Sequence, residues 1–303
     1  MIRHQSKNRA RFVANISLVL VALFWGSSFV VIKNSLDDVD PVTLVAYRFL
    51  LSASVIALFL LFKRKKMFSN FKQGFVLGLI LLLLYIPQTV GLRFTSALNS
   101  GFIMGMLVIF IPFLAFAFWR EVPSLANLLS VFSAIVGLWF LTEGIKELNP
   151  GDLLTLIAAF AGALHILITD KYVKGKYDPM VLHFQQMLTV GFVSLLCVLI
   201  LRIPLSVSSF SAVNSIIYLT VTSSIFGYGI QMFAQKHTSP ITVSLIFTLE
   251  PVFAAMFAWT IGGEEFQMLK GLGGGIIFIS MLMQVFFGER LKGKPESKKE
   301  PEE

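Results

Sequence analysis

Apolar and polar positions fall in long blocks along the chain: runs of about 20 mostly apolar residues are separated by short polar breaks. A helix of that length crosses a hydrocarbon core of about 30 Å. The connections are too short to hold a soluble domain, so the pattern predicts an all-α integral membrane protein. Ten transmembrane helices are expected, at approximately 13–33, 41–62, 73–94, 97–119, 123–142, 151–169, 179–201, 211–235, 239–262 and 267–287.

Composition and charge agree with a membrane protein and exclude a nucleic-acid partner. Hydrophobic residues make up 56% of the 303, and charged residues 14%, far from the soluble globular range. The net charge of +8 comes from basic residues at the ends of the apolar runs, and most of them share one side if both termini are cytoplasmic. This positive-inside pattern predicts a multi-pass plasma-membrane protein with a basic N-terminal segment (1–12) and a charged cytoplasmic tail (288–303).

Part of the sequence occurs twice, with the string Tyr-x-x-Gln-x6-Thr-Ser repeated after 143 residues. Each copy lies where an apolar run gives way to a polar break. Each half holds five predicted spans, and because five is odd the second half must enter the membrane from the opposite side. The sequence therefore predicts two inverted five-helix repeats, 13–143 and 151–287, around a central cavity. The matching residues are Tyr85, Gln88, Thr95, Ser96 and Glu121, and then Tyr228, Gln231, Thr238, Ser239 and Glu264.

Several short motifs resemble one known superfamily. They are Trp25-Gly26-Ser27-Ser28-Phe29, Pro41 with Arg48-Phe49, Thr95-Ser96-Ala97, Leu249-Glu250-Pro251-Val252-Phe253, and Glu264. Across residues 13–287 the sequence is similar to the drug/metabolite transporter superfamily, specifically its EamA-type ten-helix members. The resemblance implies two EamA repeats (helices 1–5 and 6–10), a central cavity and transport of small metabolites or drugs. One departure bears on the shape of the pocket: Gly162 stands where the second repeat commonly begins with tryptophan.

Two ionisable residues inside predicted spans need a partner or a task, because charge within a membrane is costly. Arg48 lies about 10 Å below the predicted outer boundary, and Glu250 about 12 Å, so the two could share one depth. In one interpretation Arg48 and Glu250 form a buried ion pair that fixes helix packing. In the other, Glu250 lines the cavity and binds a proton or a substrate cation.

Tyr85 with Gln88, and Tyr228 with Gln231, are spaced three apart, which places each pair on one helix face. Their side chains suit either hydrogen bonding to a solute or contacts between helices, and their repetition favours the cavity. His165 faces the same cavity if its span mirrors the first; otherwise it is a packing histidine. The predicted substrate-binding residues are Trp25, Ser28, Tyr85, Gln88, Asn99, His165, Tyr228, Gln231 and Glu250.

Proline and glycine patterns inside the spans predict helix distortion and close packing. Pro251, directly after Glu250, and Pro112 in the matching span each free a backbone carbonyl that could shape packing or hold substrate. Gly101-x3-Gly105 and Gly271-x3-Gly275 lack the Lys-Ser/Thr of a phosphate loop, so close helix packing is expected. We find no metal-binding or nucleophile motif of an intramembrane enzyme, and we expect no cofactor and no metal.

The pattern favours a secondary carrier for a small organic solute, moving it across the membrane by alternating access. Export of an amino acid, related metabolite or drug is the first expectation, and import of a vitamin-like or nucleotide-derived compound is the alternative. An intramembrane enzyme or a channel is the competing class. The expected partners are the solute, the lipid bilayer and at most a second copy, because the chain is expected to be a monomer or homodimer.

Overall fold

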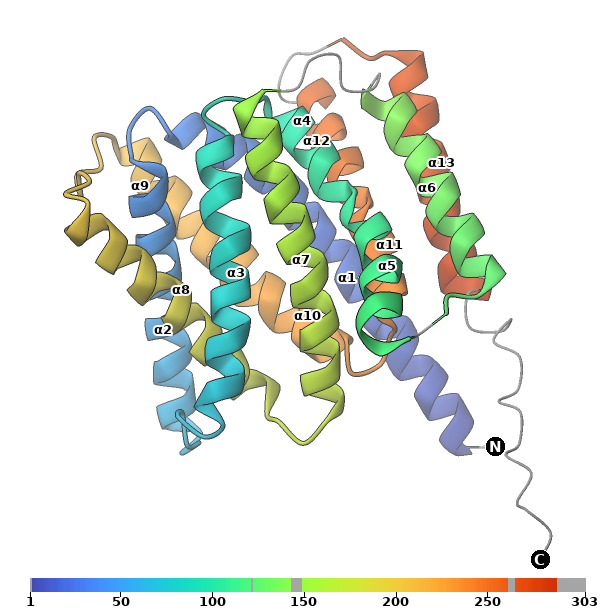
Figure 1. Cartoon of the computed structure of the whole chain (residues 1–303), viewed down its shortest axis with the longest axis horizontal. Coiled ribbons are helices and arrows are strands. Elements are labelled where there is room, and N and C mark those ends of the chain that lie inside the picture. The colour runs from blue at the N-terminus through green and yellow to red at the C-terminus, as the bar shows by residue number, and fades with distance from the viewer. Residues whose placement is uncertain (1, 121, 143–148, 261–264, 288–303) are drawn as a thin grey trace, which may run out of the picture.

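The computed structural model describes residues 2–120, 122–142, 149–260 and 265–287, and all regular structure in those residues is helical (Figure 1). Glu121, Glu264 and the tail at 288–303 lie outside the described residues. The first half contains α1 (Ile2–Ser35), α2 (Pro41–Phe62), α3 (Phe71–Gly91), α4 (Ala97–Gly105), α5 (Leu107–Trp119) and α6 (Leu125–Thr142). The second contains α7 (Pro150–Lys174), α8 (Pro179–Ile200), α9 (Phe210–Tyr218), the π-helix η1 (Leu219–Gly227), α10 (Tyr228–Ala234), α11 (Pro240–Phe247), α12 (Leu249–Thr260) and α13 (Met268–Phe287).

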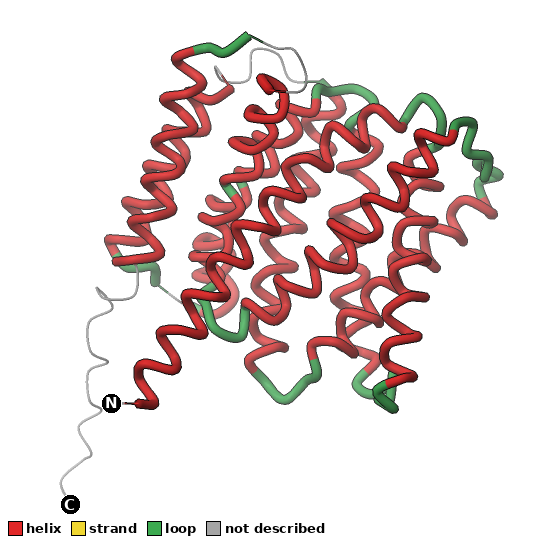
Figure 2. The backbone as a smooth tube through the Cα atoms, turned by 180° about the vertical axis from the view of Figure 1, so that it is seen from behind, coloured by secondary structure: helices red, strands yellow, loops and turns green. Residues whose placement is uncertain are grey.

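The helices match the predicted spans closely. The all-helical membrane fold is confirmed. Among the described residues, nine helical segments are long and apolar enough to cross a membrane. The shorter apolar helix Leu125–Leu141 occupies the place of the fifth predicted span. α1 already begins at Ile2, so the basic N-terminal segment extends the first helix instead of preceding it. α1 begins and α13 ends on the same side of the bundle (Figure 2).

Three of the predicted spans lie where they were expected but are irregular inside. The fourth span breaks at Met106, between α4 and α5, and the ninth breaks at Thr248, between α11 and α12. Pro251 explains the second break, because it has no N–H to donate to the carbonyl one turn earlier. The eighth span contains the nine-residue π-helix η1 between α9 and α10. Broken helices near the middle of a membrane protein expose backbone groups that can bind ligands or side chains.

Helix starts account for part of the repeated string. The hydroxyl of Ser96 caps α4 by accepting a hydrogen bond from Asn99 N at 3.0 Å, and Ser239 caps α11 through Thr242 N at 3.2 Å. A capping serine satisfies a backbone donor that the first helical turn leaves unpaired. The serine of each copy therefore serves the fold and not the solute.

The two halves interlock instead of forming separate bodies. α2 packs along α8, α3 along α7, and α6 along α13, so each pairing joins one half to the other (Figures 1 and 2). A Cβ on Gly273 would lie 2.6 Å from the carbonyl oxygen of Gly137, so this glycine packs closely against α6, whereas a Cβ on Gly275 would meet no atom within 4 Å. α3 and η1–α10, which carry the two copies of the Tyr-x-x-Gln pair, run in opposite directions (Figure 1). The two-fold relation between the halves stays a prediction.

The distribution of side chains is that of a protein surrounded by lipid. Large apolar side chains such as Leu58, Phe113 and Trp139 are 68%, 65% and 60% exposed on the outside. The interior instead holds polar groups, including the fully buried Arg48. Buried polar groups need hydrogen-bond partners, and their concentration in the middle of the bundle marks where to look for a site.

Candidate functional site: a polar cavity between the two halves

A small cavity lies in the middle of the bundle, where α1, α3, α7, α10 and the helix break before α12 meet. Its volume is about 40 Å³, room for a few water molecules, since one water needs roughly 10–15 Å³. An organic solute can enter only if the cavity opens. Of the predicted binding residues, it is lined by Trp25, Ser28, Tyr85, Gln88, His165, Tyr228, Gln231 and Glu250.

Asn99 is the predicted binding residue that the structure places elsewhere. It lies in the first turn of α4, where its backbone N–H donates to the capping Ser96. Its side chain does not line the cavity. The start of the fourth span lies near the end of the bundle, and the helix reaches the cavity only lower down, at Met104 and Leu107.

Aromatic side chains from both halves meet in the cavity. The repeat-related Tyr85 and Tyr228 lie edge to face, with ring centroids 6.0 Å apart. Trp25 lies between Tyr228 and Phe247, at centroid distances of 4.9 and 4.8 Å. Its indole N–H donates to the backbone oxygen of Ser223 at 3.1 Å, using a carbonyl of the π-helix. Trp25 thus joins the first helix of one half to the irregular helix of the other.

Arg48 supports the cavity from behind Tyr85 and forms no salt bridge with Glu250. Its Nε donates to Ser224 Oγ at 2.6 Å and its Nη2 to the Tyr85 hydroxyl at 3.1 Å. The guanidinium also lies 4.6 Å from the centroid of the Tyr85 ring and 5.2 Å from that of Phe49. These contacts hold a buried cation through hydroxyl groups and ring faces. The expected Arg48–Glu250 pair is therefore not formed in this structure.

Glu250 occupies the first turn of α12, directly after the break at Thr248. A helix N-terminus favours a carboxylate, because the unpaired N–H groups carry partial positive charge. Its backbone is held by close contact with α1: a Cβ on Gly26 would lie 2.6 Å from the carbonyl oxygen of Glu250. The side chain is 5% exposed and lines the cavity. Its predicted role in proton coupling stays a prediction.

A chain of buried hydrogen bonds leads from the cavity toward the end of the bundle where α1 begins. His165 Nε2 lies 2.8 Å from Gln186 Oε1, and Gln186 Nε2 lies 3.4 Å from His183 Nδ1. His183 Nε2 is 3.2 Å from the backbone oxygen of Ile225, another carbonyl of the π-helix. His165 is thereby held at the cavity wall by partners on α8.

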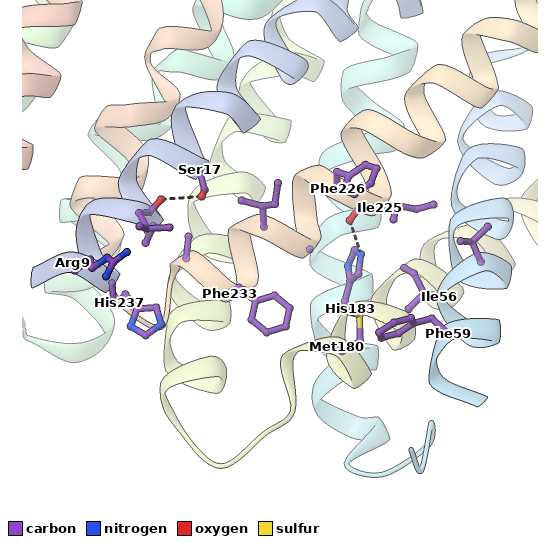
Figure 3. Close-up of a pocket in the computed structure, with 17 residues that line it drawn as sticks. Arg9, Ser17, Ile56, Phe59, Met180, His183, Ile225, Phe226, Phe233 and His237 are labelled. Carbon is purple, nitrogen blue, oxygen red and sulfur yellow. Dashed lines mark hydrogen bonds between the residues drawn. The ribbon is translucent and has the colours of Figure 1, made fainter. Parts of the chain in front are cut away.

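A larger groove of about 1130 Å³ lies on the other side of this chain, between α1 on one side and α2 with α8 on the other (Figure 3). Arg9 and His237 lie together at one end of the groove, and His183 points into it near Phe59 (Figure 3). Ile225 and Gly229 line the groove while Tyr228, between them in sequence, lines the cavity. One turn of backbone therefore separates the two spaces.

Each half has a lysine that ties the end of its first helix to the threonine of the repeated string. Lys33 Nζ donates to the backbone oxygen of Thr95 at 2.9 Å. Lys174 Nζ donates in the same way to Thr238, also at 2.9 Å. The Thr95 hydroxyl also donates to the buried carboxylate of Asp152. The threonines of the repeat therefore mark equivalent contacts at opposite ends of the bundle.

An exposed ion pair joins Lys65, after α2, to Asp178, directly before α8. Asp178 also caps α8 by accepting a hydrogen bond from Met180 N at 2.9 Å. Partial burial by itself would raise the pKa of the Asp178 carboxyl, but the hydrogen bond and charge of Lys65 and the backbone N–H of Met180 outweigh it. The pKa of Asp178 therefore lies below its ordinary value.

Comparison with known sequences identifies the family. The sequence profile of the EamA-like transporter family matches this chain twice in succession, over residues 13–143 and 149–286. The chain belongs to the EamA-like transporter family. It is similar to an uncharacterized transporter of Archaeoglobus fulgidus, 29% identical over 280 residues that cover 90% of this chain and 86% of the relative. The uncharacterized transporter YyaM of Bacillus subtilis (strain 168) is 26% identical, with coverage of 88% and 92%.

A solved crystal structure resembles this EamA-like transporter with a TM-score of 0.76. It covers 93% of this chain and 99% of the other, at 15% sequence identity, so the likeness concerns the fold alone. Family and relatives together point to a multi-pass membrane transporter and not to an enzyme.

Sequence reasoning missed three residues that shape the site of this EamA-like transporter. Phe247 lines the cavity, and nothing distinguishes it in sequence from the other phenylalanines. Ser224 binds Arg48, but it lies in a π-helix that no periodicity reveals. Gln186 could have been found, because it occupies the position in the second half that Arg48 holds in the first.

Proposed function

We propose that this EamA-like transporter is a secondary carrier that moves a small organic solute across the plasma membrane by alternating access. The observation that carries the proposal is the convergence of repeat-related side chains on one central cavity: Tyr85 and Gln88 from one half, Tyr228 and Gln231 from the other. Interlocked repeats with a site at their junction can exchange inward- and outward-open forms of similar energy. Export of an amino acid, a related metabolite or a drug is the proposed direction, with both termini cytoplasmic.

The inner groove supports uptake from the cytoplasmic side. The Ile225–Gly229 segment lies between the groove and the cavity, because Ile225 and Gly229 line the groove and Tyr228 lines the cavity. That segment contains the end of the π-helix, whose hydrogen bonding is less regular than that of an α-helix. Movement of this backbone turn would join the two spaces, while the Lys33 contacts keep the outer side closed.

Reconstitution in liposomes tests the class of function. Radiolabelled amino acids, supplied one at a time, should show saturable flux that is stimulated by unlabelled solute on the opposite side. Trans-stimulation is expected of a carrier, because the empty site returns more slowly than the loaded one. Linear, non-saturating flux of the same solutes would instead indicate a channel.

The repeated glutamines test alternating access itself. Gln88→Ala should reduce flux that begins from the outer side more strongly, and Gln231→Ala flux that begins from the inner side, because an inverted repeat would place the two amides at mirrored depths. Each variant is assayed in oriented liposomes in both directions, with folding checked by size-exclusion chromatography. Equal losses in both directions for both variants would assign the two glutamines to helix packing.

A further inference from the structure

The central cavity offers hydrogen-bond acceptors that the described protein does not use. The Glu250 carboxylate forms no hydrogen bond or ion pair with any residue that the structure describes. Gln231 donates through Nε2 to Gln235 Oε1 at 3.2 Å, but its own Oε1 is buried without a partner. A buried acceptor left unsatisfied costs free energy that a ligand with a matching donor recovers.

Hydrogen bonding on the far side of His165 adds a third acceptor. The Ile225 carbonyl can only accept, so His183 must carry its proton on Nε2, and Nδ1 of a neutral His183 must accept from Gln186. The Gln186 amide is then oriented with Oε1 toward His165, so His165 is protonated at Nε2. Its remaining nitrogen, Nδ1, is left as an acceptor.

The positive groups near the cavity are already engaged. Arg48 donates hydrogen bonds to Ser224 and Tyr85, and it does not line the cavity. The indole N–H of Trp25 likewise donates its hydrogen bond to the backbone oxygen of Ser223. Gln88 supplies an amide that can donate or accept a hydrogen bond. Among the described side chains that line the cavity, Glu250 is the one that can carry a formal negative charge, and none is a lysine or arginine. This arrangement disfavours a carboxylate or phosphate, which would meet a like charge without a cation.

Aromatic faces complete the site. Trp25 packs against both Tyr228 and Phe247, with Tyr85 adjoining Tyr228. A cation over such rings is attracted by their negative faces, and an apolar body packs against them without losing hydrogen bonds. Hydrogen-bond acceptors and aromatic rings that line one cavity are the features that recognise an alkyl- or arylammonium group.

We propose that the solute of this site is an organic amine, bound through its ammonium group to Glu250 and Gln231 Oε1 with its apolar body against Trp25 and Tyr228. The inference rests on the proposed carrier function and specifies its substrate class. An amine without a carboxylate should bind more tightly than the amino acid of the same skeleton, because the second charge has no partner among the lining residues.

Four compounds that share a para-hydroxyphenylethyl skeleton test this charge preference by isothermal titration calorimetry on the purified protein at neutral pH. Tyramine carries only the ammonium, tyrosine both charges, para-hydroxyphenylpropionate only the carboxylate, and para-ethylphenol neither. Tyramine should bind at least about tenfold more tightly than each of the others, in keeping with a charge-assisted hydrogen bond. Equal binding of the acid or the phenol, or no binding of tyramine, would overturn the proposal.

Two glutamate variants locate the effect. Glu250→Gln should weaken tyramine binding about tenfold or more while leaving para-ethylphenol unchanged. Glu265→Gln makes the same chemical change on an exposed side chain outside the cavity and should leave both affinities unaltered. Unchanged tyramine affinity in the Glu250→Gln protein would remove the carboxylate from the site. The comparison of ligands on the unaltered protein stands even if a variant fails to fold.

Liposome flux separates this inference from the proposed function. If amino acids show saturable, trans-stimulated flux while tyramine neither binds nor competes, the carrier function stands and the amine preference fails. If tyramine binds with the expected selectivity but no solute crosses, the site stands and the carrier function fails.

Discussion

Replacing Gly26 by alanine tests the contact between α1 and α12 that positions Glu250. A Cβ at this position would lie 2.6 Å from the Glu250 carbonyl oxygen, 3.0 Å from Phe253 Cβ and 3.3 Å from Ala254 N. Two of these three atoms belong to backbone, so no rotation of a flexible side chain can relieve the contact. The helices must therefore move apart or bend.

The expected loss of stability follows from how far the added Cβ of Gly26→Ala would overlap with α12. Ordinary contact begins at 3.4 Å, so α12 must retreat by about 0.8 Å at this point. Adding a methyl group to a well-packed interior costs about 1–3 kcal/mol in folding free energy. For a protein of this size that corresponds to a fall in the apparent melting temperature of about 2–5 °C. The shift also moves Glu250, so tyramine affinity should fall with stability.

A glycine in open space provides the control. A Cβ on Gly275 in α13 meets no atom within 4 Å, so Gly275→Ala should leave the melting temperature unchanged or slightly raised. Both variants are melted in the same detergent at one heating rate, with intrinsic fluorescence as the readout. If Gly26→Ala is as stable as Gly275→Ala, then α1 and α12 are not packed as closely as the structure indicates.

Two further substitutions test the ion pair between Asp178 and Lys65 and the hydrogen bond from Trp25 to the π-helix. Because the pKa of Asp178 is lowered in the folded protein, its contribution to stability is fully present above the ordinary pKa of 3.8 and is lost as the pH falls below it. Asp178→Asn keeps an N-cap but removes the pairing with Lys65, so the difference in melting temperature between this variant and the unaltered protein should narrow as the pH is lowered. A constant difference would exclude the charge as its cause. Trp25→Phe removes the hydrogen bond to Ser223 and should cost about 1 kcal/mol in a thermal unfolding assay, whereas Trp139→Phe, at a 60% exposed position, should cost little; equal costs would contradict the hydrogen bond.

The arrangement of the site could be predicted from the repeat to a useful extent. Tyr85, Gln88, Tyr228 and Gln231 were expected at the cavity because polar side chains recur on one face of two apolar helices, and the structure places all four there. Trp25, Ser28, His165 and Glu250 also line the cavity. Their predicted part in binding remains to be tested by the variants above.

Two of the expectations differ from the structure for physical reasons. The Arg48–Glu250 pair was one of two interpretations that equal depth allowed, and depth does not say which way a side chain points around a helix axis. Arg48 instead turns toward α3 and the π-helix, where Tyr85 and Ser224 satisfy it. Asn99 was placed in the cavity because it begins an apolar span, but the first turn of α4 lies at the end of the bundle.

The sequence by itself determined the membrane fold, the number of spans, the duplication and most of the cavity-lining residues. Length of apolar runs, charge asymmetry and repeat period are local or additive properties, so they can be read along one dimension. Only the tertiary structure decided which buried polar groups have a hydrogen-bond partner and which do not. Within the described part of the chain, Gln231 Oε1 and the Glu250 carboxylate have no hydrogen-bond partner, whereas Arg48, Trp25 and Gln186 hydrogen-bond to other groups. Such pairing depends on helices far apart in the chain.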